Sequence, residues 1–264
     1  MPRETLQLPQ LRPGQAFPPV EQAWGSDSPA CGLLAAGGRL DVPTLVRAYS
    51  SGIFPWFSEG QPILWWSTDP RMVLEVSAFR LRRSLKRAIQ KFLKHPGCEI
   101  RIDSAFEQVI AGCAQTDRAT MSSGSAGSAG SAGTWIVADM IQAYGALHRA
   151  GYAHSVETWV NNQLVGGLYC VALGRAVFGE SMFSQQTDAS KIALAALVSF
   201  CRFHQIRMID CQQNTKHLAS LGAAEMSRAA FLAHVNTNAA KPAPAWHFDD
   251  LYWQEILPET TVAP

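Results

Sequence analysis

The pattern of apolar and polar positions predicts a chain that mixes helices and strands. Residues 80–94 place Leu81, Leu85, Ile89 and Phe92 on one arc at 100° per residue, which predicts an amphipathic helix. Residues 188–203 are apolar nearly all round, so a helix buried against a sheet is expected there. Other helices are predicted at 39–50, at 103–115, through Met140, Tyr144 and Leu147, and near 227–235.

Strands are predicted where short, β-prone apolar runs follow one another closely. Such runs lie at 154–160, 164–173, 175–183 and 206–212. The resulting order is strand–strand–strand–helix–strand. Asn161-Asn162 provides a turn between the first two strands.

Three segments show neither the helical nor the strand pattern of apolar residues. Residues 1–30 are rich in proline and predict an extended arm, while residues 123–133 repeat Ser-Ala-Gly and predict a flexible loop. The tail from about Asn236 is expected to be loose until its aromatic cluster. That cluster consists of Trp246, Phe248, Tyr252 and Trp253.

An aromatic segment spans residues 52–71 and holds three tryptophans among prolines. Two interpretations are open. The segment forms the core of a small domain, or it is partly exposed and stacks on flat ligands.

Composition narrows the class of protein. Of 264 residues, 47% are hydrophobic and 16% are charged, with a formal net charge of +1, which is typical of a globular protein and uninformative about nucleic acid. The six cysteines show no C-x-x-C pair, so reduced thiols are expected. No stretch suits a bilayer span or a signal peptide, so a cytoplasmic protein without membrane contact is expected.

The predicted helix at 80–94 carries a one-sided charge. Its polar arc holds only cations, with no acid among them. This arrangement favours contact with a phosphate backbone, although a simply solvated face is the alternative. The cations of this arc are Arg80, Arg83, Arg87, Lys91 and Lys94.

Two acids lie inside apolar strands, which indicates a site. Asp210 and Gln212 are two residues apart, so both side chains should leave one face of the sheet while Ile209 and Cys211 face the other way. Glu180 is expected to share its side of the preceding strand with Phe178 and Met182. Structural alternatives remain for both acids. Asp210 could cap a backbone group, and Glu180 could pair with Lys191 or Arg175.

Several motifs together resemble one family. They are GIFPWF, PILWWSTDPR, GTWI, AHSVETW, LVGGLY, FGESMFS, DASK, IDCQ and HLASLGA, and they cover residues 31 to 235. In this order they resemble the leucyl/phenylalanyl-tRNA–protein transferases. The resemblance implies an α/β (α+β) fold, with a small N-terminal domain before a GNAT-like acyltransferase domain that has a mixed, mostly antiparallel sheet. The expected divisions are 1–70, 71–235 with a flexible loop at 122–133, and a tail at 236–264.

The resemblance also implies an activity and partners. Such enzymes move Leu or Phe, less often Met, from charged tRNA to the N-terminal Arg or Lys of acceptor proteins in the N-end degradation pathway. An ester becomes an amide, which is downhill, so no cofactor and no metal are expected. Catalysis should rest on positioning and on handling one proton.

Site residues follow from matching the motifs position by position. The resemblance implies Asp210 and Gln212 at the reaction centre, with Asp210 accepting or orienting the amine, and Glu180 binding the cationic acceptor. The implied aminoacyl pocket consists of Leu168, Val177, Leu194, Leu197 and Ile209. The implied contacts to the tRNA 3′-adenosine are Trp56, Trp135, Tyr49 and Tyr144. The implied contacts to the tRNA backbone are Arg83, Lys86, Arg87 and Lys91.

Two departures and two rivals accompany the resemblance. Leu168 and Val177 stand where some relatives have Met and Phe, which leaves the preference between Leu and Phe open. The Ser-Ala-Gly segment could act as a lid beside the adenosine site or as an inert spacer. A GNAT acetyltransferase is one rival, but residues 185–190 lack the glycines that cradle pyrophosphate. A non-catalytic RNA-binding module is the other, and it leaves both acids unexplained.

Overall fold

The computed structural model describes residues 7–122 and 136–257, which form two sheets joined by helices. The smaller sheet has the strand order β1-β2-β4-β3. Strand β1 runs parallel to β2, and the other pairs are antiparallel. Its strands are β1 (Gln10–Leu11), β2 (Leu33–Gly37), β3 (Phe54–Pro55) and β4 (Leu64–Trp66).

The larger sheet holds seven strands in the order β11-β5-β10-β9-β8-β7-β6. Neighbours are antiparallel except for β9 and β10, which are parallel. The mixed, mostly antiparallel sheet of the prediction is therefore confirmed. The strands are β5 (Arg71–Glu75), β6 (Cys98–Ile102), β7 (Ala153–Val160), β8 (Gln163–Leu173), β9 (Ala176–Ser184), β10 (Met208–Gln212) and β11 (Ala224–Met226).

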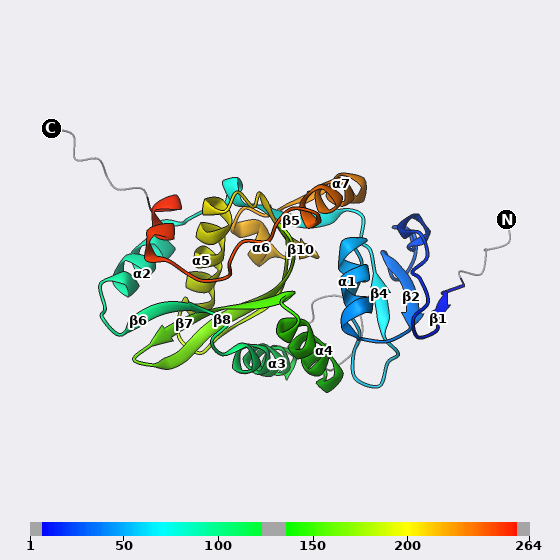
Figure 1. The fold of residues 1–264 in the computed structure, drawn as a ribbon, viewed down its shortest axis with the longest axis horizontal. Helices are drawn as coiled ribbons and strands as arrows, with labels where there is room; N and C mark the ends of the chain where they lie inside the picture. The colour runs from blue at the N-terminus through cyan, green and yellow to red at the C-terminus, as the bar shows by residue number, and fades with distance from the viewer. Residues whose placement is uncertain (1–6, 123–135, 258–264) are drawn as a thin grey trace.

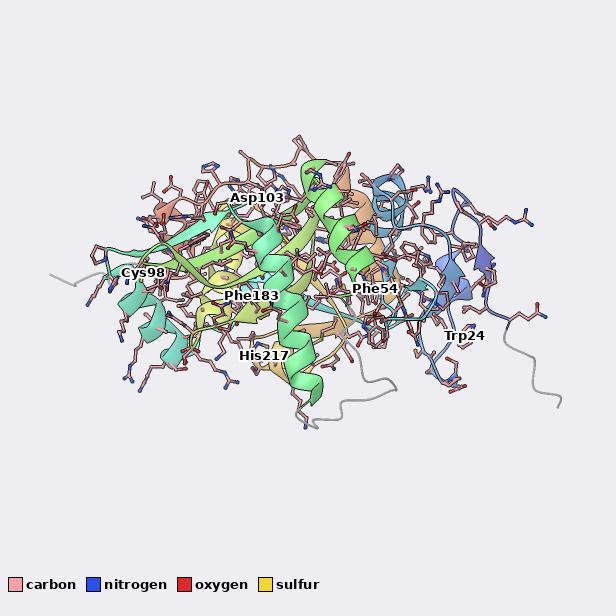
Figure 2. All side chains as sticks on the ribbon, turned by 90° about the horizontal axis from the view of Figure 1, so that it is seen from below. Trp24, Phe54, Cys98, Asp103, Phe183 and His217 are labelled. Atoms are coloured by element: carbon pink, nitrogen blue, oxygen red, sulfur yellow. The ribbon has the colours of Figure 1, made fainter. Side chains whose placement is uncertain are left out.

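Helices cover both faces of the larger sheet. Helix α5 packs on β7, β8 and β9 together with α2, whereas α3 and α4 pack on the other face. Seen from below, α3 and α4 lie side by side across the sheet, with Phe183 beside α3 (Figure 2). The α-helices are α1 (Val42–Ser50), α2 (Arg83–Leu93), α3 (Phe106–Ser122), α4 (Ala138–Arg149), α5 (Ala189–Phe203), α6 (Lys216–Ser220) and α7 (Arg228–Ala239). Short 3₁₀ turns occupy Val20–Gln22, Val76–Ala78 and Asp250–Glu255.

The two sheets meet around helices α1, α4 and α7 (Figure 1). Helix α1 begins where Asp41 accepts a hydrogen bond from the Thr44 N–H at 2.9 Å, with a proline in its first turn. The face of α1 that follows is apolar and packs into a cluster of buried side chains from both sheets. A second cluster fills the space between the larger sheet, α5 and α2.

The aromatic segment forms the core of the N-terminal region. Trp65 is fully buried and Trp66 nearly so, and the Trp65 indole N–H donates to the Gly37 carbonyl at 2.8 Å. Of the two interpretations offered by the sequence, the core is confirmed for these two rings. Trp56 is partly exposed and packs against Trp66 with ring centroids 5.3 Å apart.

The remaining predictions divide into three groups. The predicted helices and the strands from β7 to β10 are present, within a few residues at their ends except for α3, which continues seven residues beyond its predicted end. Strands β5 and β6 went unpredicted, because each is a single short run without a hairpin partner next to it in sequence. The tail was expected to be loose up to its aromatic cluster, and that cluster is well packed: Tyr252 and Trp253 are buried. The Ser-Ala-Gly segment lies outside the described residues, and the domain boundaries stay a prediction.

Candidate active site where the parallel strands diverge

The site lies where β9 and β10 separate. The two parallel strands pair only through Ile209 with Val177 and through Asp210 with Phe178. Beyond that point each strand carries an irregularity. The β8–β9 register shifts so that Cys170 faces Gly179 and Tyr169 faces Ser181, which leaves Glu180 without a partner on β8. Such a bulge bends its strand and redirects a side chain.

Strand β10 is irregular on the other side of the gap. Its pairing with β5 shifts between Asp210 and Gln212, and Gln212 adopts a left-handed backbone with φ of 54°. A residue other than glycine rarely takes this conformation without cost. The two irregularities face one another, so the Gln212 amide reaches Glu180 and donates to its Oε1 at 3.3 Å.

Asp210 is a buried carboxylate with an internal partner. Only 1% of its surface is exposed, and Arg71 binds both of its oxygens. Arg71 Nε donates to Oδ1 at 2.8 Å and Nη2 donates to Oδ2 at 2.6 Å. Oδ1 also accepts the Gln212 backbone N–H at 2.9 Å. The backbone contact that was the structural alternative for Asp210 is therefore present, alongside a buried ion pair that the sequence analysis did not foresee.

Arg71 joins three parts of the chain at this point. Its guanidinium lies 4.6 Å from the ring centroids of both Phe54 and Phe231, and its Nη1 donates to the Gly52 carbonyl at 3.3 Å. The side chain is 1% exposed. The only signal in the sequence was an arginine directly before the apolar run of β5, which is an unusual place for a cation.

Glu180 has a different environment. Tyr144 donates to its Oε2 at 3.1 Å, Gln212 donates to Oε1, and the Tyr49 and Tyr144 hydroxyls bond to one another. Among the described residues no cation forms an ion pair with Glu180. The predicted alternatives are therefore wrong within that part of the chain, because Lys191 pairs with Asp188 at 2.8 Å instead and Arg175 forms no ion pair there.

The electrostatics of Glu180 follow from this environment. Removal from water raises the pKa of Glu180 to about 8, the nearby Asp210 charge adds to the rise, and the two tyrosine hydroxyls and Arg71 oppose it. Burial and the Glu180 charge also hold the pKa of both Tyr49 and Tyr144 well above the usual value, so both phenols stay protonated. The result is a carboxyl group that titrates near neutral pH.

The residues predicted to hold the 3′-adenosine are only partly brought together. Tyr49 and Tyr144 are fully buried, with Tyr144 donating to Glu180 and the two hydroxyls bonded to one another, so neither ring offers a free face in this structure. Trp56 keeps an exposed part. Trp135 lies outside the described residues. The role of these four residues at an adenosine stays a prediction.

The five residues predicted to line the aminoacyl pocket do come together. All lie in the cluster between the sheet and α5, and none is more than 5% exposed. Their role as a pocket rather than a core stays a prediction. They are Leu168, Val177, Leu194, Leu197 and Ile209.

The basic helix is present as α2, with Leu85, Ile89 and Phe92 buried. Four cations of its polar face are exposed, and none forms an ion pair with a described residue. Their role in binding tRNA stays a prediction. They are Arg83, Lys86, Arg87 and Lys91.

Side-chain direction near the site was predicted correctly for β10 and wrongly for β9. Ile209 and Cys211 pack toward the α5 cluster, as expected from alternation. On β9, Phe178 lies in the cluster with Tyr49, whereas Met182 packs against the α5 cluster, so Glu180 cannot share a face with both. The bulge at Glu180 breaks the alternation that the prediction assumed.

The start of α5 differs from a pyrophosphate cradle. Ser184 Oγ accepts the Ser190 N–H at 3.2 Å, and Asp188 precedes the helix in a left-handed conformation, with its carboxylate on Lys191. A carboxylate at this end of a helix opposes a bound phosphate. Across residues 7–122 and 136–257 there is no group of three or more His, Cys, Asp or Glu placed to hold a metal ion. No helix in those residues is long and apolar enough to cross a membrane.

The site is therefore a gap between the diverging parallel strands of a mixed sheet, and the Glu180 carboxyl group lies between them. Comparison with known proteins then gives the family. Residues 73–236 match the family described as "Leucyl/phenylalanyl-tRNA protein transferase". Residues 38–69 match the family that describes the N-terminal domain of the same transferase. The chain belongs to the leucyl/phenylalanyl-tRNA–protein transferase family, and it is an aminoacyltransferase.

Individual relatives agree with the family match. A leucyl/phenylalanyl-tRNA–protein transferase of Polaromonas sp. strain JS666 is 64% identical over 250 residues, which is 95% of this chain and 94% of the relative. One from Albidiferax ferrireducens is also 64% identical with the same coverage. One from Ralstonia pickettii is 55% identical over 240 residues, covering 90% of this chain and 93% of the relative.

Proposed function

We propose that this protein transfers Leu or Phe, less often Met, from charged tRNA to the N-terminal Arg or Lys of acceptor proteins in the N-end degradation pathway. The acceptor amine attacks the ester carbonyl, a C–N bond forms, and the C–O bond to the terminal ribose breaks. Holding the two reactants in this geometry supplies most of the acceleration.

One observation carries the assignment of the acceptor. Of the two carboxyl groups at the site, Asp210 is already neutralised by Arg71, while Glu180 accepts from the uncharged donors Tyr144 and Gln212 and forms no ion pair with a described residue. A partly buried carboxyl group without a cation is suited to a cation that arrives with the substrate. An N-terminal Arg or Lys brings two such cations, on its side chain and on its α-amine.

In this proposal Asp210 and Gln212 lie at the reaction centre. Since both oxygens of Asp210 are bound by Arg71, Asp210 acts by orienting Gln212 through the backbone N–H of that residue. Gln212 in turn holds Glu180. The buried cluster under α5 suits the apolar side chain of the donor, and Trp56 suits its terminal adenine.

The test is transfer of labelled Leu or Phe from purified charged tRNA to synthetic peptides without CoA. Peptides that begin with Arg or Lys should be labelled, and peptides that begin with Glu or carry an acetylated N-terminus should not. Glu180→Gln should raise the KM for the acceptor far more than the KM for charged tRNA. Absence of label on every peptide would contradict the proposal.

Binding of tRNA has a separate test. Exchanging Arg87 and Lys91 together for Gln should weaken binding of charged tRNA and flatten its salt dependence, because fewer counterions are released. Measuring affinity at several salt concentrations checks this. Exchanging Arg12 and Arg39, which are exposed just beyond the ends of β1 and β2, removes the same charge and should leave the slope unchanged.

A further inference from the structure

We propose that Glu180 is the proton acceptor of the reaction, taking a proton from the α-ammonium of the acceptor, with Tyr144 and Gln212 as its positioning residues. This inference rests on the proposed function and deepens it. It gives Glu180 a step in the chemistry beyond binding a cation, and it removes that step from Asp210.

The first support is the occupancy of the two carboxyl groups. Arg71 and the Gln212 backbone N–H engage both oxygens of Asp210, and 1% of its surface is exposed. An amine could reach Asp210 only by displacing an internal ion pair, which is costly in a buried position. Glu180 is partly exposed, and its hydrogen bonds within the described part of the chain come from neutral groups, so an amine can approach it.

The second support is the geometry of the bulge. Glu180 has no cross-strand partner on β8, and its side chain therefore points into the gap where β9 leaves β10. Gln212 borders the same gap from the opposite strand and fixes one oxygen of the carboxyl group, while Tyr144 from α4 fixes the other. A carboxyl group fixed by two neutral donors is preorganised for proton transfer.

The proton balance is complete without any further reagent. The raised pKa keeps Glu180 mainly protonated at neutral pH in the free protein, and arrival of the cationic acceptor expels that proton to solvent. The Glu180 carboxylate then takes one proton from the ammonium, and the free amine attacks the ester. As the C–O bond breaks, the nitrogen gives its second proton to the ribose oxygen. Glu180 ends protonated as it began, and one proton has been released.

The surrounding charges support this sequence. Burial and the Asp210 charge raise the pKa of Glu180 to about 8 in the free protein, and the cation of the acceptor lowers it on binding. The carboxyl group can therefore lose a proton to solvent when the acceptor arrives and take one back from the ammonium. The titratable and charged groups around Glu180 are Tyr49 on α1, Tyr144 on α4, Cys170 on β8, Asp210 on β10 and Arg71 on β5.

The experiment compares two acceptors with Glu180→Gln and the unmodified protein. One peptide begins with Arg; the other has the same sequence with an aminooxy group in place of the α-amine, which is unprotonated at neutral pH. With the first peptide at saturation, Glu180→Gln should lose about 100-fold or more in kcat. With the aminooxy peptide, its kcat should be close to that of the unmodified protein.

Other results would overturn the inference without touching the proposed function. A raised KM with unchanged kcat would make Glu180 a binding residue only, and an equal loss of kcat with both peptides would make its role structural. If the unmodified protein labels neither peptide, the proposed function itself fails. Glu107→Gln changes an exposed carboxylate on α3 and is the matched control, with kcat expected to be unchanged for both peptides.

Discussion

Asp210 and Glu180 are neighbouring acids with opposite surroundings. Asp210 is on the paired part of β10, sealed from water and neutralised by Arg71. Glu180 is at a bulge of β9, partly exposed and surrounded by uncharged donors. A buried charge with an internal counter-ion contributes to the structure of the fold, whereas a carboxyl group that has no cation among the described residues is available to bind a cationic substrate. Substitutions around each of the two acids test this difference in their roles.

The largest expected effect comes from removing the internal cation. Arg71→Met leaves Asp210 buried and unpaired, which should cost about 3–5 kcal/mol of unfolding free energy. Urea denaturation measures this. Combining Arg71→Met with Asp210→Leu removes both charges and should recover most of the loss. If Arg71→Met alone were as stable as the unmodified protein, the Arg71–Asp210 pair would not be essential to the fold.

The next effect is the contribution of Glu180 to the pH dependence of stability. Its pKa is raised from 4.5 to about 8 in the fold, so the folded state favours the neutral acid. The resulting stabilisation is complete below the unfolded pKa and is lost as pH rises through the folded pKa. Unfolding free energy should therefore fall by at most about 1.4 kcal/mol per pH unit across this window. Glu180→Gln should remove this component, and parallel curves for the two proteins would refute it.

A smaller effect is expected at the neutral donors. Tyr144→Phe removes the hydroxyl that is hydrogen-bonded to the Glu180 carboxyl group, at a cost of about 1 kcal/mol in unfolding free energy. Without that donor the pKa of Glu180 rises further. The rising limb of transfer activity against pH should then move to higher pH. An unchanged profile would indicate that Tyr144 does not act on Glu180.

The smallest effect on stability is expected at Gln212. Its left-handed backbone is tolerated well by Asn, so Gln212→Asn should change unfolding free energy by less than about 0.5 kcal/mol. The Asn side chain is shorter by one methylene and should not reach Glu180. Transfer should fall while stability is kept. A variant that transfers at the full rate would remove Gln212 from the site.

The sequence predicted the elements that have a strong local pattern. Helix α2 has a clear apolar arc, α5 is apolar all round, and β7 to β9 are adjacent hairpin strands, so each could be identified from its own residues. Strands β5 and β6 are five residues each and pair with strands far away in the chain. No local pattern distinguishes such a strand from any other short apolar run.

The sequence predicted which polar residues lie at the site but not the ion pair and hydrogen bonds that they form. Glu180, Asp210 and Gln212 stood out because they are polar positions within apolar strands. The Arg71–Asp210 pair joins residues 139 apart, and the bulge at Glu180 depends on the register of β8 against β9. Both are decided by tertiary contacts. The interpretation of Tyr49 and Tyr144 as stacking residues was made from ring chemistry, whereas the structure uses their hydroxyls.

The Arg71 guanidinium also has a consequence for how the chain folds. It lies between Phe54 and Phe231, and its carboxylate partner comes late in synthesis. Until Asp210 has emerged, the earlier part of the chain would have to bury an uncompensated cation, so its core cannot close early. Contacts of such long sequence separation slow folding. We therefore expect the N-terminal region and the larger sheet to become stable in one cooperative step, with the reaction centre forming at that moment.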